Sequence, residues 1–166
     1  MRYTLTIRQE DYESLQRAIY SEPAREGGAY LLCGRSSSEN ECRFLVSRVL
    51  PVRPEDYIVR EIDRLSIRSN SYVSVAKDAL AHDASVIFVH SHPTGFPDFS
   101  NQDNREDPKL HMFLSERVPG IPHGSMIVSS PSTQPQIKGR VWTSTGWLPI
   151  DRVRIVGAYF RFIDHD

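Results

Sequence analysis

The stretch "ASVIFVHSH" at residues 84–92 restricts the fold more than any other part of the chain, because an apolar run ends there in two histidines. A short apolar run bounded by polar residues is typical of a strand that is buried on both faces of a sheet. Neither glycine nor proline interrupts this run before Pro93. We therefore expect a central strand that ends at His90 and His92.

Strand patterns and helix patterns alternate along the rest of the chain. Residues 2–7 alternate polar and apolar side chains, which predicts a half-buried strand, and residues 8–23 repeat apolar side chains at helical spacing. Further strands are expected at 28–34, 43–52, 124–130, 137–144 and 153–160. A second helix is expected at 69–82, with Tyr72, Val75 and Leu80 on one face and Ser69 or Ser71 as its cap. Residues 104–120 are expected to be partly helical, and Thr145–Gly146 to form a turn. The first two of these strands form a hairpin, and residues 53–66 leave the sheet as an excursion.

This order of elements predicts an α/β (α+β) fold in which helices flank a mixed central β-sheet. The chain has 166 residues, the usual size of one domain, so we expect residues 1–166 to form a single domain. Its 20 Lys and Arg nearly balance 21 Asp and Glu, which argues against nucleic acid or an anionic membrane as a partner. The chain start lacks a secretory signal, and no apolar run nears the ~20 residues that span a bilayer, so we expect a soluble, cytoplasmic protein.

The two histidines at the strand end suggest a metal site. Residues i and i+2 of a strand point to the same face about 6.5 to 7 Å apart, so His90 and His92 can both direct a ring nitrogen at one ion. Zinc takes histidine nitrogens and carboxylate oxygens at ~2.0 Å, and Asp103 is the natural third ligand if the prolines and glycine of 93–97 bend the chain back. The two cysteines are not spaced as a metal pair, so histidine and carboxylate would hold the ion.

A purely structural interpretation stays open at this point. The residues "SNQD" also form a capping-box sequence, with Ser100 at the N-cap and Asp103 at N3. Other metal architectures fit the chain worse: an amidohydrolase barrel needs ~250 residues, a deaminase needs P-C-x-x-C, and a zincin needs H-E-x-x-H. This chain is shorter than such a barrel and has neither motif.

The spacing resembles the JAMM motif of the JAB/MPN metalloproteases, in which His-x-His-x7-Ser-x-x-Asp follows an upstream glutamate. His90, His92, Ser100 and Asp103 match this motif without a gap, and the order of elements is similar over nearly the whole chain. The resemblance implies the JAB/MPN fold and a zinc ion held by His90, His92 and Asp103. It also implies hydrolysis of a peptide or isopeptide bond, with the hydroxyl of Ser100 stabilising the oxyanion.

The same resemblance implies a catalytic glutamate just before a short apolar strand. In "PAREGGAYLLCG" that residue is Glu26, which would transfer protons between the attacking water and the leaving amine. Glu22 is the alternative, although it lies farther from the strand. The family usually has glycine three residues after the glutamate and another that closes the strand, whereas this chain has Ala29 and Cys33 there, with Gly34 one place late.

The resemblance further implies a ubiquitin-like protein or its conjugates as substrate, with the substrate tail extended against a sheet edge. A partner enzyme of the ubiquitin-activating type is a further expectation. Residues 53–66 and 104–123 are where the family grips its substrate, and Tyr57 and Ile58 are candidate apolar contacts. The alternative is a non-catalytic MPN scaffold or recognition module that binds a ubiquitin-like partner, but the complete ligand set favours an enzyme.

The remaining polar residues receive structural interpretations. The histidines without a partner at ligand spacing, which we expect to be surface or core residues, are His82, His111, His123 and His165. Cys33 is interpreted as a buried strand residue, with a redox role left open. We therefore expect one zinc ion per chain.

Overall fold

The computed structural model describes residues 1–129, 136–157 and 161–164. Within these ranges the strands are β1 (Arg2–Arg8), β2 (Gly28–Ser37), β3 (Glu41–Pro51), β4 (Tyr57–Arg60), β5 (Leu65–Ile67), β6 (Ser85–His92), β7 (His123–Ser129), β8 (Gln136–Thr143), β9 (Gly146–Val156) and β10 (Arg161–Asp164). The helices are α1 (Gln9–Ile19), α2 (Ser69–Ala81) and α3 (Asn101–Arg117), and a 3-10 turn covers Pro54–Asp56. Among the described residues, no helix is both long and apolar enough to cross a membrane.

Eight of the strands form one mixed sheet in the order β1-β3-β2-β6-β7-β8-β9-β10, and β1 also pairs with β9. β2 and β3 form the predicted hairpin. β6 lies between antiparallel β2 and parallel β7, and all its residues are buried. The mixed α+β architecture and the central position of the histidine strand are therefore as the sequence predicts.

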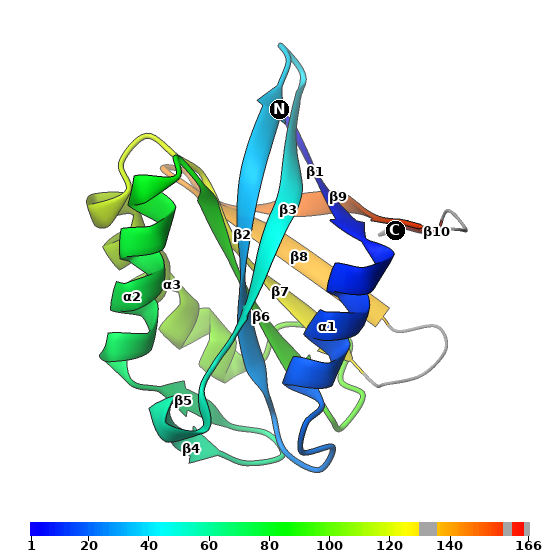
Figure 1. Cartoon of the computed structure of the whole chain (residues 1–166), viewed down its shortest axis with the longest axis vertical. Helices are drawn as coiled ribbons and strands as arrows, with labels where there is room; N and C mark the ends of the chain where they lie inside the picture. Colours follow the sequence, from blue (N-terminus) through cyan, green and yellow to red (C-terminus); the bar gives the residue numbers. More distant parts are fainter. Residues whose placement is uncertain (130–135, 158–160, 165–166) are drawn as a thin grey trace.

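Helices cover both faces of the sheet, with α1 on one side and α2 and α3 on the other (Figure 1). Side chains of a strand point alternately to the two faces. In β2, Leu31 and Cys33 accordingly pack in the core beside α1, whereas Tyr30 and Leu32 pack in the core beside α2 and α3. Two hydrophobic cores therefore sandwich the centre of the sheet.

The same alternation assigns the motif residues of β6 to opposite faces. Ile87 and Val89 belong to the core beside α1, and Val86 and Phe88 belong to the core beside α2 and α3. His90 and His92 continue the second series, so they lie on the side of α3, and the ring of His90 stacks on Phe88 at 5.6 Å. Ser91 continues the first series toward α1.

The excursion at 53–66 folds as a small unit of its own. β4 and β5 pair with each other as a two-stranded antiparallel sheet that is separate from the main sheet. In Figure 1 this hairpin lies at the end of the molecule where α2 begins. It therefore forms a wall beside the elements that carry the motif.

Three sequence predictions need correction. The N-cap of α2 is Arg68, which makes no side-chain capping bond, so neither Ser69 nor Ser71 caps this helix. Leu80 is exposed and does not belong to the buried face of α2. The strand expected at 153–160 begins earlier, at Gly146, whose φ of 112° forms the predicted turn, and residues 158–160 lie outside the described residues.

Candidate metal centre

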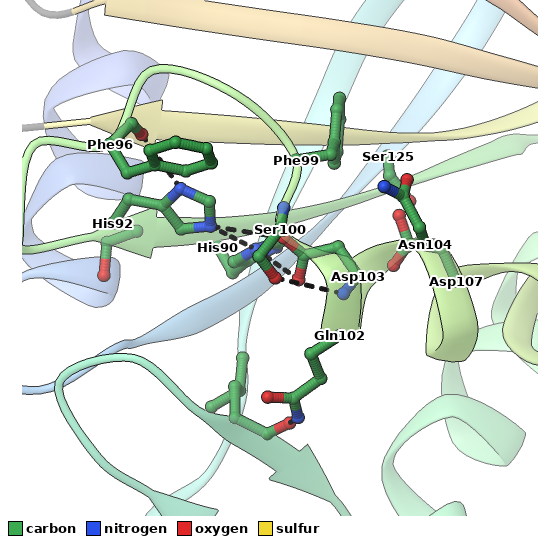
Figure 2. Close-up of polar contacts among 12 residues, drawn as sticks. His90, His92, Phe96, Phe99, Ser100, Gln102, Asp103, Asn104, Asp107 and Ser125 are labelled. Carbon is green, nitrogen blue, oxygen red and sulfur yellow. Dashed lines mark hydrogen bonds and ion pairs between the residues drawn. The ribbon is translucent and has the colours of Figure 1, made fainter.

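Three side chains converge where β6 ends and α3 begins. Nε2 of His90 lies 3.1 Å from Nε2 of His92 and 3.1 Å from Oδ1 of Asp103, and Nε2 of His92 lies 3.4 Å from Oδ2 of Asp103. Figure 2 shows the two rings and the carboxylate turned toward one another. Within the described part of the chain, these residues form the one group of His, Cys, Asp and Glu with metal-ligand spacing.

The separations match those of a tetrahedral zinc site. Ligand atoms at ~2.0 Å from a tetrahedral ion lie about 3.3 Å from one another, and a catalytic zinc site uses three such protein ligands. The two nitrogens lie 3.1 Å apart, and they lie 3.1 Å and 3.4 Å from different oxygens of Asp103, so all the separations are near this value. His90 and His92 are buried, while the side chain of Asp103 keeps 12% of its surface exposed. The group can therefore hold one ion at the end of a path to solvent.

Neighbouring backbone groups orient the second ring. Nδ1 of His92 lies 3.0 Å from the carbonyl oxygen of Phe96, which favours a proton on Nδ1 and leaves Nε2 with its lone pair toward the other donors. The turn that returns Phe96 to the ring includes Gly95 at a φ of 78°, a conformation that glycine adopts without strain. Nδ1 of His90 is buried without a hydrogen-bond partner among the described residues.

Asp103 is held by the helix cap. Its backbone N–H donates to Oγ of Ser100 at 3.2 Å, and its Oδ2 accepts from the backbone N–H of Ser100 at 2.6 Å. Burial opposes ionisation of Asp103, but hydrogen bonds with His90 and His92 outweigh it and hold the pKa of the carboxyl far below its usual value. The capping box and the ligand geometry therefore coexist in the same residues, and Asp103 is a carboxylate.

Glu26 lies in the loop before β2 and is 6% exposed. Its backbone N–H donates to the carbonyl of Glu61 at 2.7 Å, and its carbonyl accepts from Nε of Arg60 at 2.9 Å. Burial raises the pKa of Glu26 to about 7, with the charges of His90 and His92 acting in the opposite direction. Glu26 therefore has a pKa near neutral pH and lies close enough to the two histidines for their charges to affect that pKa.

Glu22, the alternative, occupies a different environment. Its side chain is half exposed and forms ion pairs with Arg60 and Arg25. It therefore has a surface role in the loop that carries Glu26. The structure brings Glu26, rather than Glu22, into the interior beside the strand end.

Ser91, the middle residue of His-x-His, fixes this loop to the strand. Its hydroxyl donates to the carbonyl of Ile19 at 3.0 Å and accepts from the N–H of Gly27 at 2.9 Å, while its own N–H donates to the carbonyl of Gly27. The next residue, Gly28, pairs with His90 in the sheet. A Cβ on Gly27 would lie 2.3 Å from the carbonyl oxygen of Ile19. The approach of the loop to α1 therefore requires glycine directly after Glu26.

A cavity of about 490 Å³ opens beside the metal centre. Its wall is formed by β5 with neighbouring residues, by the start of α2 and by α3, and its floor includes Tyr30, Phe88 and His90. Gln102 reaches from α3 across to the hairpin and donates to the carbonyl of Leu65 at 2.9 Å (Figure 2). Sequence reasoning did not find this contact or those of Ser91, because both join residues far apart in the chain.

The other histidines and Cys33 lie away from the centre. His82 is exposed at the end of α2, and His165 lies outside the described residues. His111 and His123 are buried, and burial lowers their pKa values to about 3 and about 4, so both are neutral core residues. Cys33 is fully buried and its pKa is raised by burial, the opposite of a reactive thiol.

Comparisons with known proteins concern the fold and the family of this chain. The solution structure of protein DSY2949 from Desulfitobacterium hafniense is similar to this chain, with a TM-score of 0.57, 20% sequence identity, and coverage of 88% of this chain and 89% of that one. At this identity the likeness concerns the fold alone. A search of curated proteins gives no match. A family model described as prokaryotic homologs of the JAB domain matches residues 10–143, which include all five predicted site residues, and the chain therefore belongs to this family.

Proposed function

We propose that this protein is a zinc-dependent peptidase or isopeptidase that hydrolyses the amide bond after the C-terminal tail of a ubiquitin-like protein. The observation that carries the proposal is the convergence of His90, His92 and Asp103, whose side-chain donor atoms lie 3.1 to 3.4 Å apart, with Glu26 buried nearby at a pKa of about 7. A general base works best when its pKa lies near the pH at which the enzyme operates, and Glu26 meets this condition near neutral pH.

The donor set suits zinc. Two imidazole nitrogens and one carboxylate oxygen leave a fourth position for water, and the histidine with a carbonyl partner on Nδ1 has its Nε2 free to bind. When bound, zinc supplies Lewis-acid chemistry, since it makes water reactive near neutral pH and polarises a scissile carbonyl. His90, His92 and Asp103 would hold the ion.

Glu26 would move the protons. Its carboxylate accepts a proton from the attacking water, which adds to the substrate carbonyl, and then gives that proton to the amine as the carbon–nitrogen bond breaks. In the metal-free protein the pKa of Glu26 is about 7, so this group can both bind and release a proton near neutral pH. The charge of a bound dication would lower that pKa and favour the base form.

Ser100 would stabilise the oxyanion of the tetrahedral intermediate. As the helix cap, its oxygen accepts a hydrogen bond from the N–H of Asp103. A hydroxyl has one donor as well as two acceptor sites, so the proton of Ser100 remains available for a substrate oxygen. The capping role therefore positions the donor instead of competing with it, and one such donor is commonly worth ~2.7 to 4 kcal/mol of transition-state stabilisation.

The cavity between β5 and α3 suits an extended substrate tail. Among the described residues β5 pairs with no strand other than β4, and the cavity that borders β5 also reaches His90 and Asp103. An extended peptide that pairs with the second edge of β5, where it would displace the Gln102 side chain from the carbonyl of Leu65, would run toward the metal ligands. Ile58 is exposed on the same hairpin, whereas the hydroxyl of Tyr57 accepts from the N–H of Gly28. The proposed substrate is a ubiquitin-like protein, and the proposed partner is an enzyme of the ubiquitin-activating type.

The test uses two matched glutamate variants. Bacterial ubiquitin-like proteins with a C-terminal peptide extension are incubated with wild type, Glu26→Gln or Glu22→Gln, with and without chelator, and the products are read by intact mass. We expect wild type and Glu22→Gln to release the peptide. Glu26→Gln should keep its zinc and cleave about 10² to 10⁴-fold more slowly. Metal-loaded wild type that binds these proteins and leaves them intact would favour the non-catalytic scaffold.

A further inference from the structure

Arg140 of β8 is a buried cation with partners on several sides. Its side chain is 10% exposed and lies between the rings of Phe99 and Trp147, with the guanidinium carbon 3.7 Å and 4.2 Å from the ring centres. One terminal nitrogen donates to Oδ1 of Asn104 at 2.6 Å, and the other donates to Oδ2 of Asp107 at 2.7 Å. A rigid, planar guanidinium with stacked rings and two directed bonds fixes the groups around it more firmly than an ammonium does.

The contacts of this arginine bracket the segment that carries the third metal ligand. Phe99 directly precedes Ser100, Asn104 directly follows Asp103, and Asp107 lies one helical turn farther along α3. Figure 2 shows Asn104 and Asp107 together on the side of α3 that faces the strands. The cap and the ligand are therefore held from both ends by one side chain of the sheet.

A second strand joins the same cluster. Ser125 of β7, which pairs with Arg140 across the sheet, lies near the carboxylate of Asp107, where it opposes the rise in pKa that burial causes, and its hydroxyl lies 2.8 Å from Nε2 of His111. Asp107 is 4% exposed, and its charge acts on His90. We call Arg140, Asn104, Asp107 and Ser125 the α3 anchor. It ties α3 to β7 and β8, and β7 is hydrogen-bonded to β6.

We propose that Arg140 and Asp107 are positioning residues of the metal centre, which set the distance between Asp103 on α3 and the two histidines on β6. The inference rests on the proposed function, because it concerns the same metal. Secondary structure fixes the separation of the histidines, since both belong to one strand. It does not fix the separation between helix and sheet, and the metal site tolerates little error in that separation.

Stability alone gives a weak reason for this arrangement. A buried ion pair costs desolvation of both charges, and well-packed apolar residues in its place are often as stable or more stable. Removing one partner alone is destabilising, because the other charge stays buried without compensation. Positioning and stability can therefore be separated by comparing single and double replacements of the pair.

The experiment measures Co²⁺ binding to the metal-free protein by competition with a chelator, together with the visible spectrum of bound Co²⁺, which reports its coordination geometry. Arg140→Lys keeps the charge but has one nitrogen in place of the two that bond to Asn104 and Asp107, and it lacks the planar group between the rings, so it should fold and bind Co²⁺ about 10-fold or more weakly, with an altered spectrum. Arg140→Met with Asp107→Leu removes both charges and should recover stability without recovering the affinity. Unfolding by denaturant gives the stability of each variant.

Arg53→Met is the control for breaking an ion pair outside the metal centre. Arg53 is itself exposed, but it pairs at 2.9 Å with buried Asp56 of the 3-10 turn, which is no part of α3. The control should lose stability and keep the affinity and spectrum of wild type. Arg140 variants that bind Co²⁺ as wild type does, with an unchanged spectrum, would overturn the inference. Wild type that binds no Co²⁺ would overturn the proposed metal site itself, and the positioning role with it.

Discussion

Removal of the Glu26 carboxyl from the metal-free protein should change how folding stability depends on pH. Burial is the main cause that raises the pKa of Glu26 from 4.5 to about 7 in the folded state. Between these values the folded protein keeps the proton that the unfolded chain releases. The stabilisation is therefore fully present below about pH 4.5 and is lost as the pH rises through about 7.

The size of the effect follows from the same two values. They differ by about 2.5 pH units, and each unit corresponds to about 1.4 kcal/mol, so the free energy of unfolding of wild type should fall by about 3 kcal/mol relative to Glu26→Gln across this window. Glutamine has nearly the same shape and binds no proton. The comparison between the two proteins therefore removes contributions from groups that do not interact with Glu26, and the difference that remains belongs to Glu26 together with its coupling to His90 and His92.

The assay is denaturant unfolding of chelator-treated protein, followed by circular dichroism at several values between about pH 4.5 and 7.5. Glu22→Gln is the control, since its half-exposed side chain lies in the same loop and carries the same charge. Its stability curve should run parallel to that of wild type. Parallel curves for wild type and Glu26→Gln would refute the argument that burial prepares this carboxyl for proton transfer near neutral pH.

Three further outcomes are expected. His92→Ala should lose most of its zinc in elemental analysis, because two donors remain, and full retention would contradict its assignment as a ligand. Ser100→Ala should keep zinc, cleave with a kcat about 10² to 10³-fold lower, and lose about 1 kcal/mol of folding stability because the helix cap is removed. A loss of activity no larger than the loss of folded protein would mean that Ser100 acts only as a cap. Gly27→Ala should lower the free energy of unfolding by about 1 to 3 kcal/mol, and an unchanged denaturation midpoint would contradict the close approach to Ile19.

Local sequence patterns determined the elements of the site that lie close together in the chain. The apolar run before His90 predicts a buried central strand, and the strand period puts His90 and His92 on one face, as the structure has them. The capping box at Ser100 and Asp103 is also local and forms as predicted. Each of these features depends on neighbours within a few residues, so it can be predicted from the sequence.

Other elements depended on partners that local patterns do not reveal. β9 begins well before the predicted 153–160, and Pro149 hides it from a pattern search, since proline is rare inside strands. Pairing of β9 with β1 begins at Ile150, just after that proline. The cap of α2 was mispredicted for a related reason, because two serines in the right place make no capping bond.

Only the tertiary structure decided which glutamate lies inside and how α3 is held. Two glutamates, Glu22 and Glu26, lie in the loop between α1 and β2, and the choice of Glu26 follows from the pairing of Gly28 with His90 and from the bonds of Ser91 to the same loop. Arg140 reads in the sequence as an ordinary strand residue, yet it bonds to α3 across more than thirty positions of the chain. Burial raises a pKa, and long-range contacts set a distance between elements, only when the chain is folded. The sequence thus determined which residue types could bind the metal, while the raised pKa of Glu26 and the distance between Asp103 and the two histidines depend on tertiary packing.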